Sequence, residues 1–203
     1  MPFPDRLRLP LDFDPARLAR DLAQATLWTR HFVRQNYEGD WEVIALRAPS
    51  DARHPSSMIN ARPISGARFV DTKLLDACPY FREVLASFAC PLDSARLMRL
   101  SAGSAIHEHF DDGMSFEEGH ARLHIPILTN AQVDFRINGA RVDMAPGSTW
   151  YLRFSDPHSV ANRGETDRVH LVVDAVADDW LGRTFTAATN LRGGDLFLAT
   201  PPG

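Results

Sequence analysis

Apolar and polar residues begin to alternate at about residue 94, and this period of two is typical of half-buried β-strands. The clearest alternating runs are residues 122–127, 133–137, 150–154 and 168–173. Asn138–Gly139 is a strong signal for a tight hairpin, and Pro146–Gly147 indicates another turn. Short strands with regular turns predict an antiparallel sandwich or barrel, for which a jelly roll is the natural small solution.

The first ninety residues carry helical spacing instead. Asp14 is a suitable cap for a helix that begins at Pro15, and Pro79 predicts the start of a second helix. The apolar stripe of the second helix consists of Phe81, Val84, Leu85 and Phe88. Residues 41–46 have the composition of a strand, and the segment 49–66, rich in proline and serine, is predicted to be a loop.

These patterns together predict one mainly β domain with helices packed on its outside. The expected divisions are a helical and mixed part in residues 1–92, a jelly-roll core in 93–180 and an irregular C-terminal tail in 181–203. A chain of 203 residues is long enough for one well-formed core but too short for two large domains.

Charge and composition narrow the classes of function. The formal net charge of −4 gives no basic footprint for nucleic acid. No apolar run is long enough to cross a membrane, and the first residues lack the pattern of a signal peptide. Cys78 and Cys90 make neither a disulfide framework nor a zinc cluster. We therefore expect a cytoplasmic protein with reduced cysteines.

Histidines concentrate in the β region, where six of the eight fall between residues 107 and 170. His109 and Asp111 are two residues apart, so a strand would point both the same way. With His158 from another strand they would complete two histidines and one carboxylate, the set that binds Fe(II) and leaves coordination positions open. His107 is predicted to share their face and is an alternative ligand. The simpler alternative is a polar, solvated strand face.

Arg168 follows His158 by ten residues and lies on the polar side of an apolar strand. A buried, forked cation suits the carboxylate of a 2-oxo acid, although an exposed ion pair is the commoner role of arginine. Arg122 and His124 share a strand face and would either line the same cavity or face solvent. His170 shares the face of Arg168, where a hydrogen-bonded core histidine is the more common interpretation.

The chain resembles the aspartyl/asparaginyl β-hydroxylase family, a branch of the Fe(II)/2-oxoglutarate dioxygenases whose bacterial members include cis-proline hydroxylases of free amino acids. The similarity extends over about residues 69–181. It rests on the order and spacing of short fragments at 69–72, 78–85, 109–111, 122–127, 129–130, 147–152, 157–164 and 167–171.

This resemblance implies a double-stranded β-helix with Fe(II) between its sheets and with 2-oxoglutarate and O2 as co-substrates. The positions that match the family's ligands are His109, Asp111 and His158. Those that match its co-substrate residues are Arg168, which binds the remote carboxylate, and the pair Arg122 and His124. Two positions depart from the family, namely Met98, where some members have a serine, and His107.

The implied activity is hydroxylation of an unactivated C–H bond, in an amino acid or in an aspartyl/asparaginyl-type residue of a peptide. Asn162, Arg163 and Arg153 are candidate partners for a substrate carboxylate or amide. The first alternative is a cupin-like metal-binding protein that acts on a small acid or sugar without 2-oxoglutarate, and Arg168 argues against it. The second is a member that has lost its chemistry, and the intact ligand set argues against that.

Overall fold

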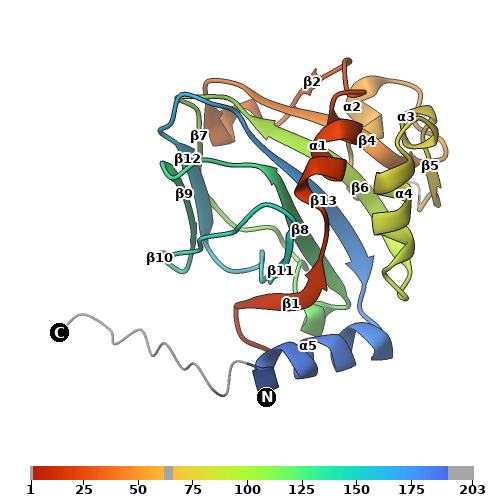
Figure 1. Ribbon diagram of the computed structural model, residues 1–203, viewed down its shortest axis with the longest axis vertical. Helices are drawn as coiled ribbons and strands as arrows, with labels where there is room; N and C mark the ends of the chain where they lie inside the picture. The colour runs from red at the N-terminus through yellow and green to blue at the C-terminus, as the bar shows by residue number, and fades with distance from the viewer. Residues whose placement is uncertain (1, 62–65, 192–203) are drawn as a thin grey trace.

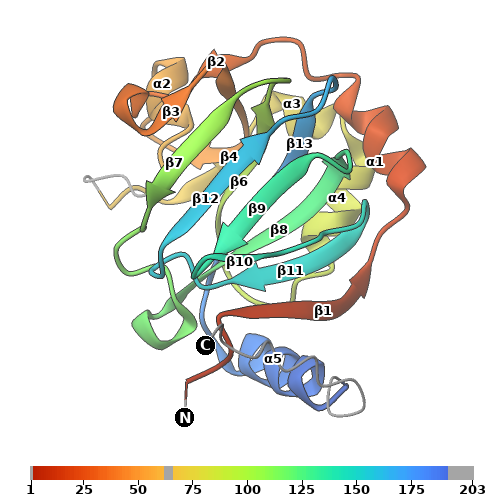
Figure 2. The same ribbon diagram turned by 90° about the vertical axis from the view of Figure 1, so that its left-hand side faces the viewer.

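The computed structural model describes residues 2–61 and 66–191 of the chain. Its core is two antiparallel sheets that face each other (Figures 1 and 2). The larger sheet has the order β1 (Arg6–Asp12), β11 (Ser148–Leu152), β8 (His120–Leu128), β13 (Arg168–Val176), β6 (Leu92–Leu100), β4 (Trp41–Pro49) and β2 (Thr29–Arg30), with β5 (Phe69–Asp71) also paired to β4. The smaller sheet has the order β10 (Ala140–Arg141), β9 (Val133–Ile137), β12 (His158–Asn162), β7 (Ala105–His109) and β3 (Tyr37–Glu38).

This arrangement confirms the predicted jelly roll, and the predicted hairpin lies within it. Asn138 and Gly139 join β9 to β10 with φ values of 50° and 72°. A tight hairpin turn requires such positive φ values, and asparagine and glycine adopt them at least cost.

Alternation along β13 shows how the fold separates two environments. Val169, Leu171 and Val173 point to the outer face of the larger sheet, into a core shared with the helices. Arg168, His170 and Asp174 have the opposite parity and are buried on the inner face, between the sheets. The alternation therefore places these three polar side chains of β13 inside the sandwich. There each needs hydrogen-bond partners, and each charge needs a counter-charge.

Helices cover the outer face of the larger sheet. α1 (Pro15–Leu22) begins as predicted, because the Asp14 side chain accepts hydrogen bonds from the backbone N–H groups of residues 16 and 17. α4 (Pro79–Ala86) buries Phe81 and Val84 in the same core. The short elements are α2 (Pro55–Met58), α3 (Lys73–Asp76) and two 3-10 turns at Arg34–Asn36 and Phe116–Glu118. α2 lies inside the segment that the sequence predicts to be a loop.

Two terminal elements differ from the sequence-based expectation. The tail predicted to be irregular from residue 181 is helix α5 (Asp179–Leu191) as far as the described residues extend, and residues 192–203 lie outside them. Phe185 of α5 is fully buried and packs on Tyr151 with ring centroids 4.4 Å apart. Near the N-terminus, β1 pairs with β11 and lies beside α5 (Figure 2). Both elements are held by tertiary contacts that a local pattern does not reveal.

A second core fills the space between the two sheets. It combines apolar side chains such as Met98, Phe135 and Phe154 with buried arginines, histidines and aspartates. None of the helices in the described part of the chain is both long and apolar enough to traverse a bilayer.

Candidate metal centre

Three potential ligands converge at one end of the inter-sheet cavity. His109 ends β7, Asp111 follows it in the next loop, and His158 begins β12 on the neighbouring strand. Their ligand atoms all lie within 4.8 Å of one another. His109 and Asp111 are partly buried and His158 is buried. The sequence predicted this group, and the structure brings all three members together.

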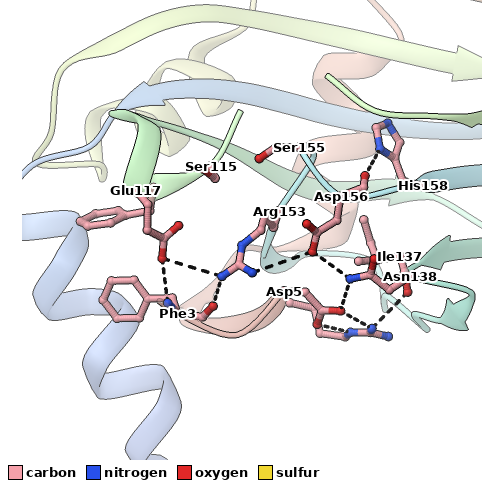
Figure 3. Close-up of polar contacts among 12 residues, drawn as sticks. Phe3, Asp5, Ser115, Glu117, Ile137, Asn138, Arg153, Ser155, Asp156 and His158 are labelled. Atoms are coloured by element: carbon pink, nitrogen blue, oxygen red, sulfur yellow. Dashed lines mark hydrogen bonds and ion pairs between the residues drawn. The ribbon is translucent and has the colours of Figure 1, made fainter. Parts of the chain in front are cut away.

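Backbone carbonyls fix the tautomer of both histidines. The Nδ1–H of His109 donates to the carbonyl of His107 at 2.7 Å. The Nδ1–H of His158 donates to the carbonyl of Asp156 at 3.0 Å, as Figure 3 shows. A carbonyl only accepts, so each Nδ1 carries the proton and each Nε2 keeps a lone pair. Such a hydrogen bond behind a histidine is the usual support of a metal ligand.

The loop that carries His158 is itself tied down by polar contacts. Asn138 donates to the Asp156 carboxylate at 2.8 Å, and Arg153 forms an ion pair with it at 3.9 Å (Figure 3). Asn138 also donates to Asp5 at 2.9 Å, which connects this loop to the segment preceding β1. These contacts hold the carbonyl of Asp156, and through it the His158 ring, in one orientation.

A β-bulge in β7 corrects one expectation. The prediction that His107 and His109 share a face is wrong. His109 pairs with His158 and Ile106 pairs with Val160, so β7 advances by three residues while β12 advances by two. The extra residue turns both Ile106 and His109 toward the cavity. His107 points outward instead, where its Nε2 lies 3.4 Å from Glu38 Oε1.

The electrostatic environment keeps His158 and Asp111 in their metal-binding forms. Burial lowers the pKa of His158 to about 4, so its imidazole is neutral at pH 7. Burial raises the pKa of Asp111, but the nearby charge of Arg122 opposes this, and the pKa is held below its ordinary value. A neutral imidazole and an ionised carboxylate are the forms that bind a divalent metal.

Arg122 lines the cavity and makes two ion pairs that the sequence did not reveal. Its Nη1 donates to Asp111, and its Nε donates to Asp174 Oδ1 at 2.6 Å. Asp174 also accepts from Arg96 Nη2 at 2.7 Å and from Ser94 at 2.9 Å. Arg122 therefore orients the candidate carboxylate ligand through a chain of buried ion pairs that Asp174 joins.

We expect Asp174→Ala to lower the free energy of unfolding by about 3–5 kcal/mol, because it leaves two buried guanidinium groups without their shared counter-charge. Urea denaturation measures this change. The matched control is Glu83→Ala, which removes the exposed ion pair with Arg17 and should cost less than about 1 kcal/mol. Equal losses in the two variants would contradict the role assigned to Asp174.

Arg168 lies deeper in the cavity and is 2% exposed. Its Nη2 donates to His170 Nδ1 at 2.8 Å. Among the described residues it has no carboxylate partner, and its Nε has no hydrogen-bond partner. Burial lowers the pKa of the guanidinium to about 9, which expresses the cost of an uncompensated charge. An anionic group that entered the cavity would relieve that cost.

His170 and His124 support Arg168 from behind. Because His170 Nδ1 accepts from Arg168, the Nδ1 of His124, 3.1 Å away, is the donor in their contact. His124 also stacks on Phe154 with ring centroids 5.0 Å apart. Burial, together with the charge of Arg168, holds the pKa of both histidines well below the usual value, so both are neutral. The single lone pair of His170 Nδ1 is therefore shared by Arg168 Nη2 and His124 Nδ1.

All six residues predicted for the site line one cavity. The volume of this cavity is about 380 Å³. Met98 and Trp41 also line it. The three residues predicted to bind substrate are engaged elsewhere. Asn162 donates to the carbonyls of Leu100 and Thr166, Arg163 pairs with Asp134, and Arg153 pairs with Glu117 and Asp156.

Sequence reasoning missed Arg96 and Asp174. Asp174 has a recognisable signal, because it is a charged residue of inward parity on a strand whose other parity is apolar. Arg96 alternates with Ala95 and Leu97, as Arg168 does with its own neighbours. Parity alone does not single out Arg96, because β6 also carries Asp93 and Arg99 on its other face.

The fold and the site together define a double-stranded β-helix with a facial group of two histidines and one carboxylate. Solved structures share this fold. A 2OG-Fe(II) oxygenase family oxidoreductase from Burkholderia pseudomallei is 16% identical, with 82% of this chain and 81% of that one covered and a TM-score of 0.54. The nickel complex of the non-heme monooxygenase ThoJ is 15% identical, with 94% of both chains covered and a TM-score of 0.50.

Within this class the chain belongs to the aspartyl/asparaginyl β-hydroxylase family, whose family model matches residues 16–178. Among curated proteins it is similar to the L-proline cis-4-hydroxylase of Rhizobium meliloti (strain 1021). The two are 29% identical over 167 residues, which is 80% of this chain and 57% of that protein. The chain therefore spans a little more than half the length of this relative.

Proposed function

We propose that this protein is an Fe(II)- and 2-oxoglutarate-dependent hydroxylase of a small amino acid. The observation that carries the proposal is the combination of two features in one cavity. A group of His109, Asp111 and His158 lies at its wall, and a buried arginine without an anionic partner among the described residues lies deeper inside. The first feature suits a divalent metal with open positions, and the second suits the far carboxylate of a 2-oxo diacid.

The residues of the chain have distinct tasks in this proposal. His109, Asp111 and His158 hold Fe(II), and Arg122 orients the carboxylate ligand. Arg168 anchors the remote carboxylate of 2-oxoglutarate, and His170 accepts a hydrogen bond from its guanidinium. Bound Fe(II), 2-oxoglutarate and O2 supply the oxidation of an unactivated C–H bond. Phe135, Phe154 and the other apolar lining residues exclude bulk water.

The family and the curated relative suggest the substrate class. The relative is by its name an L-proline cis-4-hydroxylase, so a free amino acid is the first candidate, and an aspartyl/asparaginyl-type residue of a peptide is the second. The alternative function, a cupin-like metal-binding protein that acts without 2-oxoglutarate, gives no role to the buried cation of Arg168. We therefore favour the hydroxylase.

The proposal is tested by incubating the purified protein with Fe(II), ascorbate, 2-oxoglutarate and a panel of free amino acids and short peptides. Mass spectrometry should detect succinate and a product heavier by one oxygen atom. Removal of iron by a chelator should stop both, and re-addition of Fe(II) should restore them. Product formation that needs no 2-oxoglutarate would favour the cupin-like alternative.

The carboxylate ligand can be assigned with a pair of variants. Asp111→Ala should weaken iron binding by more than tenfold, because it removes a charged ligand, whereas His107→Ala should leave iron affinity unchanged within about twofold. Iron titration followed by metal analysis measures both. The reverse outcome, with iron lost only from the His107 variant, would exchange the two assignments.

A further inference from the structure

The two carboxylate oxygens of Asp111 have different surroundings. Oδ1 lies 3.9 Å from Nε2 of His109, which is the atom that His109 offers to a metal. Oδ2 accepts a hydrogen bond from Arg122 Nη1. The backbone N–H of Asp111 donates to the carbonyl of Phe154 at 2.8 Å, which fixes the main chain that carries the carboxylate. One oxygen of Asp111 is therefore available to a metal, and the other is engaged by Arg122.

Arg122 is held from its other side by Asp174. The two residues stand opposite each other in the pairing of β8 with β13, so the register of the sheet sets their separation. Arg122 Nε donates to Asp174 Oδ1 at 2.6 Å, and Nη2 donates to Asp174 Oδ2 at 3.1 Å. Such a two-fold contact fixes the plane of a guanidinium as well as its position. All three nitrogens of Arg122 are thus engaged, and Nη1 is directed at Asp111.

The number of carboxylate oxygens that bind a metal decides how many coordination positions stay open. A carboxylate binds a divalent cation through one oxygen or through both. With two histidines and one carboxylate oxygen, a six-coordinate ion keeps three open positions, whereas only two remain if both oxygens bind. The proposed reaction requires three, because the keto-acid end of 2-oxoglutarate takes two and O2 needs another.

We propose that Arg122 is a positioning residue that restricts Asp111 to coordination through Oδ1 and so keeps one position free for O2. This inference rests on the proposed function and specifies how Arg122 acts on the carboxylate ligand. Coordination through both oxygens would break the charge-assisted hydrogen bond of Oδ2 and would leave a buried donor of Arg122 unpaired. Because Asp174 holds the guanidinium in place, Arg122 cannot follow the carboxylate as it turns.

The first test counts open positions in the parent protein. Mn(II) replaces Fe(II), and the relaxation rate of water protons reports the exchangeable water molecules on the metal. Saturating 2-oxoglutarate should lower the metal-bound part of this relaxation to about one third, because it displaces two of three water molecules. A crystal structure of the same complex should show Asp111 bound through Oδ1 alone. Coordination through both oxygens would overturn the proposal, whatever the variants do.

Arg122→Met removes the donor to Asp111, while Asp174 keeps Arg96 and Ser94 as partners. The carboxylate is then free to bind through both oxygens. In saturating 2-oxoglutarate the metal-bound relaxation should therefore fall at least about fivefold below that of the parent, because no open position is left for water. Relaxation equal to that of the parent would overturn the proposal.

The affinity for 2-oxoglutarate tests the other role of Arg122, the contact with the co-substrate that the family resemblance implies. If Arg122 acts on Asp111, calorimetric titration of Arg122→Met with 2-oxoglutarate should give an affinity within about tenfold of the parent, since only a nearby charge is lost. A loss of more than about 100-fold, with the relaxation at saturation unchanged, would assign Arg122 to the co-substrate and overturn the proposal.

Two further variants guard against a general folding effect. Arg122→Lys keeps a buried cation, but one ammonium group cannot make the two-fold contact with Asp174 and the bond to Asp111 together. Its relaxation in saturating 2-oxoglutarate should lie at least about twofold below that of the parent, and equality would contradict the proposal. Arg99→Met is the matched control and should behave like the parent, because Arg99 pairs with Glu42 at 2.5 Å and does not line the cavity.

The outcomes separate this inference from the proposed function. A parent protein that binds neither Mn(II) nor 2-oxoglutarate would refute the proposed function and this inference with it. A parent that binds both, while Arg122→Met and Arg122→Lys keep its relaxation, would refute only the role of Arg122. Thermal melts by circular dichroism confirm that each variant is folded before relaxation is compared.

Discussion

His158→Ala is expected to abolish iron binding and hydroxylation. The variant removes a neutral imidazole that the carbonyl of Asp156 holds in its ligating tautomer. Loss of a hydrogen bond behind a ligand already costs about 10–100-fold in metal affinity, so loss of the ligand itself should exceed about 100-fold. Anaerobic reconstitution with Fe(II), followed by metal analysis, should give about one iron per parent chain and almost none in the variant.

The control for this experiment is His120→Ala. His120 is part-exposed on β8, and its Nε2 lies 3.7 Å from Asp93, outside the group of three ligands. It should retain the iron content and activity of the parent. His158→Gln, which keeps a polar side chain of similar length, guards against a folding defect in the alanine variant. If His158→Ala held iron as tightly as the parent, the proposed metal centre would be wrong.

Arg168→Met should change two properties in opposite directions. Binding of 2-oxoglutarate should weaken at least about 100-fold, because a buried charge-assisted contact with its remote carboxylate is lost. The protein without ligands should become more stable by about 1–4 kcal/mol, because an apolar side chain of similar length replaces a buried cation whose cost depresses its own pKa. Urea denaturation and calorimetric titration of the Zn(II)-loaded protein measure the two changes.

The conservative variant Arg168→Lys separates charge from geometry. A lysine supplies a point charge but not the planar fork, so its affinity for 2-oxoglutarate should fall between those of the parent and Arg168→Met. The free energy of unfolding of Arg168→Met can be compared with that of Asp174→Ala. The first variant should be more stable than the parent, whereas the second should be less stable because it removes the counter-charge of two arginines. If Arg168→Met bound 2-oxoglutarate like the parent, the anchor would have to be sought elsewhere in the cavity.

Much of the architecture could be predicted because its signals are local. The Asp14 cap and Pro15 begin α1 through contacts within three residues. Asn138 and Gly139 form their turn because their own backbone preferences permit positive φ. The alternation assigned Arg122 and His124 to one face of β8, and Arg168 and His170 to one face of β13, since side chains two apart on a strand share a face whatever lies around them.

Other features depend on contacts between distant segments. The bulge that separates His107 from His109 is defined by the pairing of β7 with β12, and residue parity alone predicted the wrong face for His107. The segment from residue 181 was predicted to be irregular. Its described part is helical because Phe185 of α5 is buried against Tyr151. The ion pairs of Arg122 with Asp111 and Asp174 join separate parts of the chain, and no local pattern reveals them.

The sequence by itself predicted the starts of α1 and α4, the hairpin and the strands of the jelly roll, and the face of most strand residues, because these follow from local backbone preference and the period of two. The candidate ligands followed from this pattern together with the resemblance to the family. Only the tertiary structure decided which inward charges meet: that Asp174 joins Arg96 to Arg122, and that Arg168 is buried beside His170. Charge pairing depends on distances across paired strands, and those distances are set when the two sheets close over a shared interior.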